Sequence, residues 1–218
     1  MKTAVYVPRM RHHWAMSGER NGTVRGDDGV TRCPWGSTDP LYVSYHDDEW
    51  GRPLRGDDEL FEMLTLEAFQ SGLSWITILR KRPAFRDAFA GFRIEAVAAF
   101  DDDDVDRLLA DARIVRNRAK IDAALVNARL ASELAGGGFT ELLWSFAPPA
   151  RRRRLTSFEA VPDKTQESAA LSKELKRRGF RFIGPTVAYA FMQAVGMVDD
   201  HLAACEVQVS PRAMPLEM

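Results

Sequence analysis

Apolar residues recur at helical spacing along almost the whole chain, and no stretch alternates with a period of two for long enough to demand a sheet. Leu60, Phe61 and Leu64, for example, are spaced so that they share one face of a helix. A pattern of this period buries one side of each helix against its neighbours. The sequence therefore predicts an all-α fold, a single compact helical domain without internal repeats.

Start and stop signals divide this pattern into separate helices. Asp57 or Asp58 is expected to cap the first long helix and Ser74 the next one, which Pro83 is expected to end. The acidic run at residues 101–104 is typical of a helix N-terminus, where the helix dipole favours negative charge. Further helical segments are expected at residues 83–92, 116–134, 167–178 and 185–195, with a glycine stop at residues 136–138 and an exposed linker at residues 148–162.

Length and composition narrow the class of protein. The chain has 218 residues, 45% of them hydrophobic, which fits one domain with a sizeable core. Its formal net charge of −1 excludes a globally basic nucleic-acid coat protein but allows a local basic face. No uncharged apolar stretch approaches about 18 residues, so neither a membrane span nor a membrane partner is expected. The chain start carries no continuous apolar signal segment, and we expect a cytoplasmic protein that is a monomer.

Three regions differ in character along the chain. Residues 1–31 contain scattered arginine and glycine without a sustained apolar period, which predicts a disordered N-terminal extension. The helical body is expected at residues 32–206. Residues 207–218 are expected to form a C-terminal tail.

The body contains only two cysteines and two histidines, which are Cys33, His46, His201 and Cys205. They form one pair at each end, and the spacing of four between His201 and Cys205 predicts that both lie on one helix face. Two thiolates and two imidazoles suit tetrahedral Zn²⁺ without an open position for a catalytic water. The pattern is compatible with one structural zinc ion that joins the two ends of the body, although the 12 residues between Cys33 and His46 are not a standard zinc-finger spacing. Two buried cysteines with two unrelated histidines remain the alternative, and an intracellular location disfavours a disulfide.

Aromatic residues crowd around the first of these pairs. They are Trp35, Tyr42, Tyr45 and Trp50, with Trp75 further along the chain. Tyrosine and tryptophan rings grouped near a carboxylate can form a cage for a planar or cationic ligand. Glu67 supplies a carboxylate among apolar neighbours, which would bury it at a cost in free energy unless it faces a pocket. Ordinary core packing of the rings and a surface position for Glu67 on an amphipathic helix are the alternatives.

A basic helix end, a glycine-bounded turn and a new helix follow one another in KRRGFRFIGPTVAY, residues 176–189. In such a helix-hairpin-helix, backbone N–H groups of the turn and of the second helix's N-terminus bind a phosphate. The candidate residues are Gly179, Gly184 and Thr186, with Lys176 and Arg177 adding non-specific attraction to DNA. A Gly-Pro pair between two helices is also a generic connector, so this motif alone leaves both interpretations open.

Taken together, three segments resemble the DNA-3-methyladenine glycosylase I family of helix-hairpin-helix DNA glycosylases. They are CPW…DPLYVSYHDDEWG in residues 33–51, LEAFQSGLSW in residues 66–75 and GFRFIGPT…FMQA…DDHLAAC in residues 179–205. The resemblance implies zinc ligands at Cys33, His46, His201 and Cys205. It implies contacts to the lesion base from Glu67 and Tyr45, with Trp35, Tyr42, Trp50 and Trp75 around them. It also implies a DNA wedge near Gln70, Gly72 and Leu73.

The same resemblance implies base excision repair of double-stranded DNA that carries 3-methyladenine. Methylation at N3 makes the adenine cationic and weakens its bond to the sugar, so the protein has to select and position the flipped base. No lysine lies between Gly179 and His201 to attack the sugar, which predicts a monofunctional hydrolase without strand cleavage. Two alternatives remain. One is a DNA-binding module that zinc holds together and that catalyses no reaction, and the other is a relative that excises another damaged base.

Overall fold

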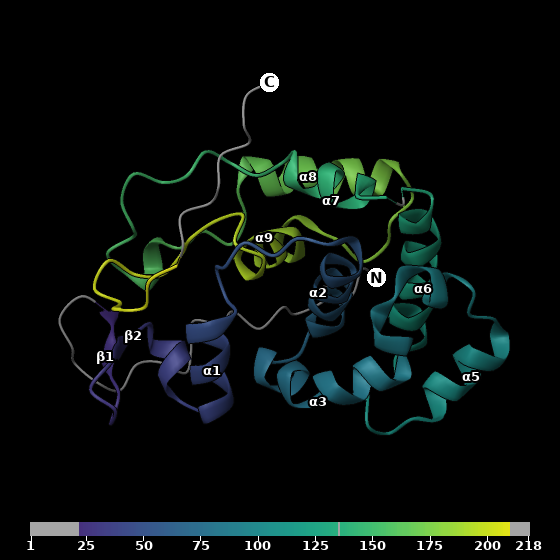
Figure 1. Cartoon of the computed structure of the whole chain (residues 1–218), viewed down its shortest axis with the longest axis horizontal. Coiled ribbons are helices and arrows are strands. Elements are labelled where there is room, and N and C mark those ends of the chain that lie inside the picture. The colour runs from purple at the N-terminus through teal and green to yellow at the C-terminus, as the bar shows by residue number, and fades with distance from the viewer. Residues whose placement is uncertain (1–21, 135, 210–218) are drawn as a thin grey trace, which may run out of the picture.

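The computed structural model describes residues 22–134 and 136–209, so residues 1–21 and 210–218 of the two expected tails lie outside it (Figure 1). The described part is mostly helical, as predicted. Its helices are α1 (Pro40–Asp48), α2 (Asp57–Gln70), α3 (Trp75–Ala88), α4 (Ile94–Ala98), α5 (Asp102–Ala110), α6 (Arg118–Ser132), α7 (Gly138–Trp144), α8 (Gln166–Arg177) and α9 (Pro185–Ala194). Short 3-10 turns are η3 (Pro34–Ser37), η4 (Ala90–Phe92) and η5 (Phe158–Ala160). Within the described ranges, no helix has the length and apolar character needed to cross a membrane.

Helix α2 occupies the centre of the molecule and packs against α3, α6 and α9 (Figure 1). Every side chain from Met63 to Phe69 is buried, because neighbouring helices cover this part of α2 on all sides. A helix that is covered all round has no solvent-facing stripe for its polar residues. This position explains how Glu67, on the last turns of α2, comes to lie in the protein interior.

The first two acidic residues of α2, Asp57 and Asp58, cap other helices instead of α2 itself. The carboxylate of Asp57 accepts a hydrogen bond of 2.9 Å from the backbone N–H of Gly137, at the start of α7. The carboxylate of Asp58 accepts one of 2.7 Å from the backbone N–H of Ile94, at the start of α4. The prediction that either residue caps α2 is wrong, since the N-cap position belongs to Gly56. Both carboxylates are used to join α2 to distant helices.

The prediction that Pro83 ends a helix is also wrong, because α3 runs without interruption from Trp75 to Ala88. Proline removes one backbone hydrogen bond, but Ile78 and Phe85 on either side of it are fully buried. Burial of the whole apolar face outweighs the loss of one hydrogen bond. The acidic run at residues 101–104, in contrast, begins α5, as predicted, and Asp101 and Asp104 form a capping box there.

The two ends of the described chain lie side by side (Figure 1). Strands β1 (Val24–Arg25) and β2 (Thr31–Arg32) form an antiparallel pair, so the predicted disorder does not hold for residues 22–31. The backbone N–H of Glu206 donates to the carbonyl of Thr31 at 2.8 Å, and the Thr31 N–H donates to the Glu206 carboxylate at 2.6 Å. These contacts bring the first and last parts of the body together next to α1.

Candidate functional site

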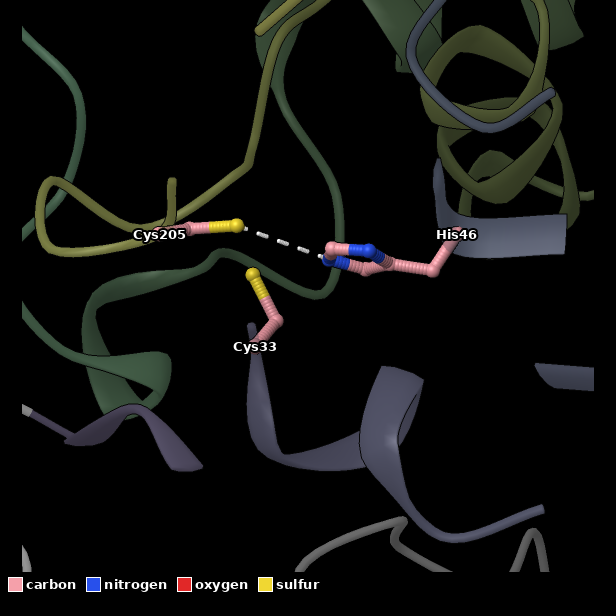
Figure 2. Close-up of side chains that lie close together, drawn as sticks. All are labelled: Cys33, His46 and Cys205. Carbon is pink, nitrogen blue, oxygen red and sulfur yellow. Dashed lines mark hydrogen bonds between the residues drawn. The ribbon is translucent and has the colours of Figure 1, made fainter. Parts of the chain in front are cut away.

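Three of the four candidate metal ligands meet where the two ends of the body come together (Figure 2). Cys33 precedes η3, His46 lies in α1 and Cys205 in the C-terminal segment, and their ligand atoms lie within 4.8 Å of one another. The Sγ atom of Cys205 is 3.8 Å from Nε2 of His46. All three side chains are buried, and both cysteines are free thiols. Two sulfurs and one imidazole nitrogen at these distances can hold a metal ion.

His201 lies beside this cluster, with its ring centroid 4.7 Å from that of His46. The prediction that His201 and Cys205 share a helix face is wrong, because both follow the end of α9 in irregular chain. The Asp199 carboxylate accepts a hydrogen bond of 3.0 Å from the backbone N–H of His201. Such a local side-chain bond competes with helical hydrogen bonding. Tertiary contacts, and not helix periodicity, bring His201 to the cluster.

A carboxylate orients each of the two imidazoles. Nδ1 of His46 lies 2.8 Å from Oδ1 of Asp47, and Nδ1 of His201 lies 2.8 Å from Oδ1 of Asp199. A hydrogen bond from Nδ1–H to a carboxylate leaves Nε2 as the available ligand atom, an arrangement common behind metal-bound histidines. Sequence reasoning missed both aspartates, although each stands within two residues of its histidine.

Two arginines hold these carboxylates in place. Arg32 donates to Asp47 at 2.7 Å, and Arg154 donates to Asp199 at 2.9 Å. Burial alone would raise the pKa of Asp47, but hydrogen bonds from Arg32 and His46 lower it overall. Arg154 belongs to the segment predicted to be an exposed linker, and here it is tied to the C-terminal segment. The cluster is therefore supported by a second layer of charged side chains.

Trp35 connects the cluster to a group of aromatic rings. Its ring centroid lies 5.1 Å from that of His46 and 6.2 Å from that of Tyr45. Neighbouring residues of a helix point about 100° apart, so Tyr45 and His46 of α1 can serve two different sites. All five predicted aromatic residues contact at least one other member, through the pairs Trp35–Tyr42, Trp35–Trp50 and Tyr45–Trp75.

Glu67 lies in the interior next to this aromatic group. Its side chain is 4% exposed, which excludes the alternative of a surface glutamate. Burial raises the pKa of Glu67 to about 8, and no described residue contributes a hydrogen bond or a cation to its carboxyl group. Burial, followed by the nearby charge of Glu67, raises the pKa of Tyr45 well above its usual value. A buried acid without a partner is costly unless a ligand completes it.

Trp75 carries a second unsatisfied group. Its Nε1 atom is buried and has no hydrogen-bond partner among the described residues. The Trp75 and Tyr45 ring centroids are 5.5 Å apart, so Tyr45 adjoins both the unpaired donor and the unpaired acid. An orphaned donor and an orphaned acid in one aromatic group fit a planar ligand with polar edges. Two surface hollows, of about 260 and 640 Å³, are lined by other residues.

The predicted wedge residues lie where α2 ends and the chain turns into α3. Gly72 has a φ of +85°, a conformation that favours glycine. Leu73 is 40% exposed, which is unusual for a large hydrophobic side chain in this protein. Gln70 donates from Nε2 to the carbonyl of Leu73 at 3.4 Å. The turn therefore presents an apolar side chain to solvent within a short, internally bonded loop.

The predicted hairpin consists of α8 and α9, which pack against each other and are joined by residues 178–184. Gly179, with a φ of +100°, reverses the chain directly after α8. Gly184 and Thr186 are exposed at the start of α9. Arg177, predicted to face DNA, pairs with Glu174 at 2.7 Å. Lys176 is exposed at the end of α8.

Comparison with known proteins first gives the class. The family model described as methyladenine glycosylase matches residues 35–209. The chain therefore belongs to the methyladenine glycosylase family. Its relatives are named DNA-3-methyladenine glycosylases, which are N-glycosylase enzymes.

Individual relatives agree with that assignment. The DNA-3-methyladenine glycosylase 1 of Escherichia coli (strain K12) is 48% identical over 179 residues, which cover 81% of this chain and 96% of that protein. A crystal structure of 3-methyladenine DNA glycosylase I is 46% identical, with a TM-score of 0.76 over 80% of this chain and 98% of that one. A variant of 3-methyladenine DNA glycosylase I in complex with 3-methyladenine is 37% identical, with a TM-score of 0.75 over 80% and 96%.

Proposed function

We propose that this protein is a monofunctional DNA glycosylase that hydrolyses the N-glycosidic bond of 3-methyladenine in double-stranded DNA. The observation that carries the proposal is the buried, unpartnered Glu67 beside Tyr45 and the unpaired Nε1 of Trp75. Membership of the methyladenine glycosylase family supports the same substrate. We propose that the protein acts inside the cell and as a monomer.

The charge of the substrate explains how Glu67 can select it. Because burial holds the pKa of Glu67 at about 8, the carboxyl group of the free protein is largely protonated at neutral pH. A cationic base beside it favours the charged form and lowers that pKa, so the bound lesion faces a carboxylate. Aromatic rings add a cation–π attraction to the same base. Unmodified adenine is neutral and gains neither interaction.

Bond cleavage needs little help once the methylated base is in place. The glycosidic electron pair leaves with the base, which cancels the positive charge on the ring. Positive charge then develops on the deoxyribose, where the Glu67 carboxylate stabilises it. Water adds to the anomeric carbon and passes its proton to this carboxylate. Tyr45 contacts the base and helps to hold it in this position.

We propose that Cys33, His46 and Cys205, with His201 as the fourth ligand, bind one structural Zn²⁺. Two thiols and two imidazoles, each imidazole oriented by a carboxylate, are typical of a closed tetrahedral site. A closed site supplies stability and no chemistry. The ion would join the start of the body to its end, next to the helix that carries Tyr45.

We propose two DNA contacts on the surface. The turn with Gln70, Gly72 and Leu73 would enter the space that the flipped base leaves. The hairpin would bind backbone phosphate through Gly179, Gly184 and Thr186, with Lys176 and Arg177 close by. The exposure of Leu73, Gly184 and Thr186 supports these assignments.

Replacing Gly184 with valine should weaken binding to damaged and undamaged duplexes by the same factor, because phosphate contacts position a protein without reading bases. The fold should tolerate the change, since φ is −76° and a Cβ at Gly184 would meet nothing within 4 Å. Fluorescence anisotropy with matched duplexes measures both affinities. Gly138→Val is a suitable control, because a Cβ there meets only Leu134, at 3.8 Å. A loss confined to damaged DNA would assign the hairpin to lesion recognition instead.

Chromatography of bases released from methylated DNA tests the function itself. We expect free 3-methyladenine as the main product, with DNA strands that stay intact until the abasic sites are cleaved by alkali. Release of a different base would favour a relative with another substrate. Tight DNA binding without any released base would favour the non-catalytic module.

A further inference from the structure

Helix α6 carries two buried polar side chains, Lys120 and Asn127, which are 8% and 3% exposed. The two residues are seven positions apart, which places them on the same face of the helix and about 10 Å apart along its axis. Neither was singled out by the sequence or used in the reaction above. Each holds one of the two loops that are proposed to contact DNA.

Lys120 holds the loop that follows α2. Its Nζ atom donates to the backbone carbonyl of Phe69 at 2.8 Å and to that of Ser71 at 2.6 Å. These carbonyls lie at the C-terminus of α2, where helical partners run out and the helix dipole favours a cation. The next two residues are Gly72 and Leu73. Lys120 therefore fixes the point from which the proposed wedge projects.

Asn127 holds the hairpin between α8 and α9. Its Oδ1 accepts from the backbone N–H of Arg181 at 2.8 Å, and its Nδ2 donates to the Arg181 carbonyl at 3.1 Å. The next residue, Phe182, has a φ of +62°, a conformation that is strained for a bulky side chain. Strained backbone persists only where its surroundings hold it. The paired hydrogen bonds of Asn127 are such a restraint.

The two loops share a further property. Leu73 and Phe182, 40% and 45% exposed, are the exposed large hydrophobic side chains of the described residues, and each loop carries one. Arg181 and Lys176, both exposed, lie near Phe182 in the sequence. Proteins that bend or open a duplex insert apolar side chains between base steps and place basic residues beside them. A DNA duplex is therefore the partner whose chemistry fits both loops together.

We propose that Lys120 and Asn127 are positioning residues that set, through the rigid helix α6, the spacing at which both loops meet one duplex, and that Phe182 contacts DNA alongside Leu73. This inference rests on the proposed function, which assigns both loops to DNA. A flipped base reaches Glu67 only if the two loops hold the duplex in a fixed register. A misplacement of about 1 Å can lower a rate about a hundredfold.

Lys120→Met tests the first half of the proposal. We expect kcat/KM on a duplex with 3-methyladenine to fall about 10- to 100-fold, while the affinity for the free base stays within about twofold, because the groups around Glu67 are untouched. Lys120→Arg, which retains donors, should recover most of the activity. Lys81→Met is the matched control, since Lys81 also donates to two loop carbonyls, those of Ala112 at 3.3 Å and Arg113 at 2.7 Å.

The second half is tested at the hairpin. Asn127→Leu should lower the same kcat/KM. In the double variant with Lys120→Met, kcat/KM should fall by less than the product of the two single-variant factors, because one displaced loop already breaks the spacing. Phe182→Ala, on an exposed side chain that leaves the core intact, should weaken duplex binding about fivefold or more.

Three results would overturn the inference while leaving the glycosylase function intact: equal losses in Lys120→Met and Lys81→Met, losses of Lys120→Met and Asn127→Leu that multiply, or unchanged duplex binding in Phe182→Ala. Failure of the wild-type protein to release 3-methyladenine would instead overturn the proposed function. The two failures are therefore distinguishable in one set of measurements.

Discussion

Glu67→Gln should lower kcat/KM for 3-methyladenine excision about 10- to 150-fold, because a hydrogen bond to a charged group is worth about 1.5–3 kcal/mol. Glutamine keeps the size of the side chain and one acceptor but removes the charge. The melting temperature should hold or rise, since a buried acid without a partner destabilises the fold. Steady-state kinetics and thermal unfolding of the two proteins measure both effects. Equal excision rates at matched folding would remove Glu67 from the site.

Glu67 also predicts how stability depends on pH. Its pKa is raised from the ordinary value of 4.5 to about 8 in the folded protein. Between these values the folded chain keeps a proton that the unfolded chain releases, so this residue lowers stability as pH rises through that window. Glu67→Gln has no such proton. The melting temperature of Glu67→Gln minus that of the wild type should therefore increase from about pH 4.5 to about pH 8. A difference that stays constant over this range would contradict the burial of an unpartnered acid.

Loss of the metal should lower the melting temperature by more than about 10 °C. Structural zinc sites contribute on the order of 10 kcal/mol in small domains, and a chain of this size loses about 2–4 °C per kcal/mol. Cys205→Ser should show this loss, while turnover by the protein that remains folded changes much less, because the ion takes no part in the reaction. Calorimetry and assays below the melting transition separate the two effects.

Metal analysis provides the control for that prediction. The wild type should contain about one zinc ion per chain, and a chelator should destabilise it without further effect on Cys205→Ser. His201→Gln should also lose zinc if His201 closes the tetrahedral site. Full zinc content in His201→Gln would limit the ligands from this chain to Cys33, His46 and Cys205. Purified wild type that contains no zinc would end the proposal.

The helical class of the fold and the bounds of three helices followed from the sequence alone. The expected segments at 116–134, 167–178 and 185–195 agree within two residues with α6, α8 and α9. Helical periodicity and the signals that start or stop a helix are local, so a short stretch of chain contains all the information needed. The unusual position of Glu67 could be recognised in the same way, because a single acid within a run of apolar residues is visible in the local sequence.

Packing of the folded chain determines which side chains find partners that are distant in the sequence. Asp57 caps α7 instead of α2 because the N–H of Gly137 lies within its reach after folding. A spacing of four residues is compatible with a helix or a loop. His201 and Cys205 lie in a loop, because the chain after α9 contacts β2 and α1 instead of continuing as a helix. Lys120 and Asn127 look like ordinary helix residues in the sequence, and their roles exist only because two loops end against α6. Such pairings are set by packing across the core, which local spacing does not encode.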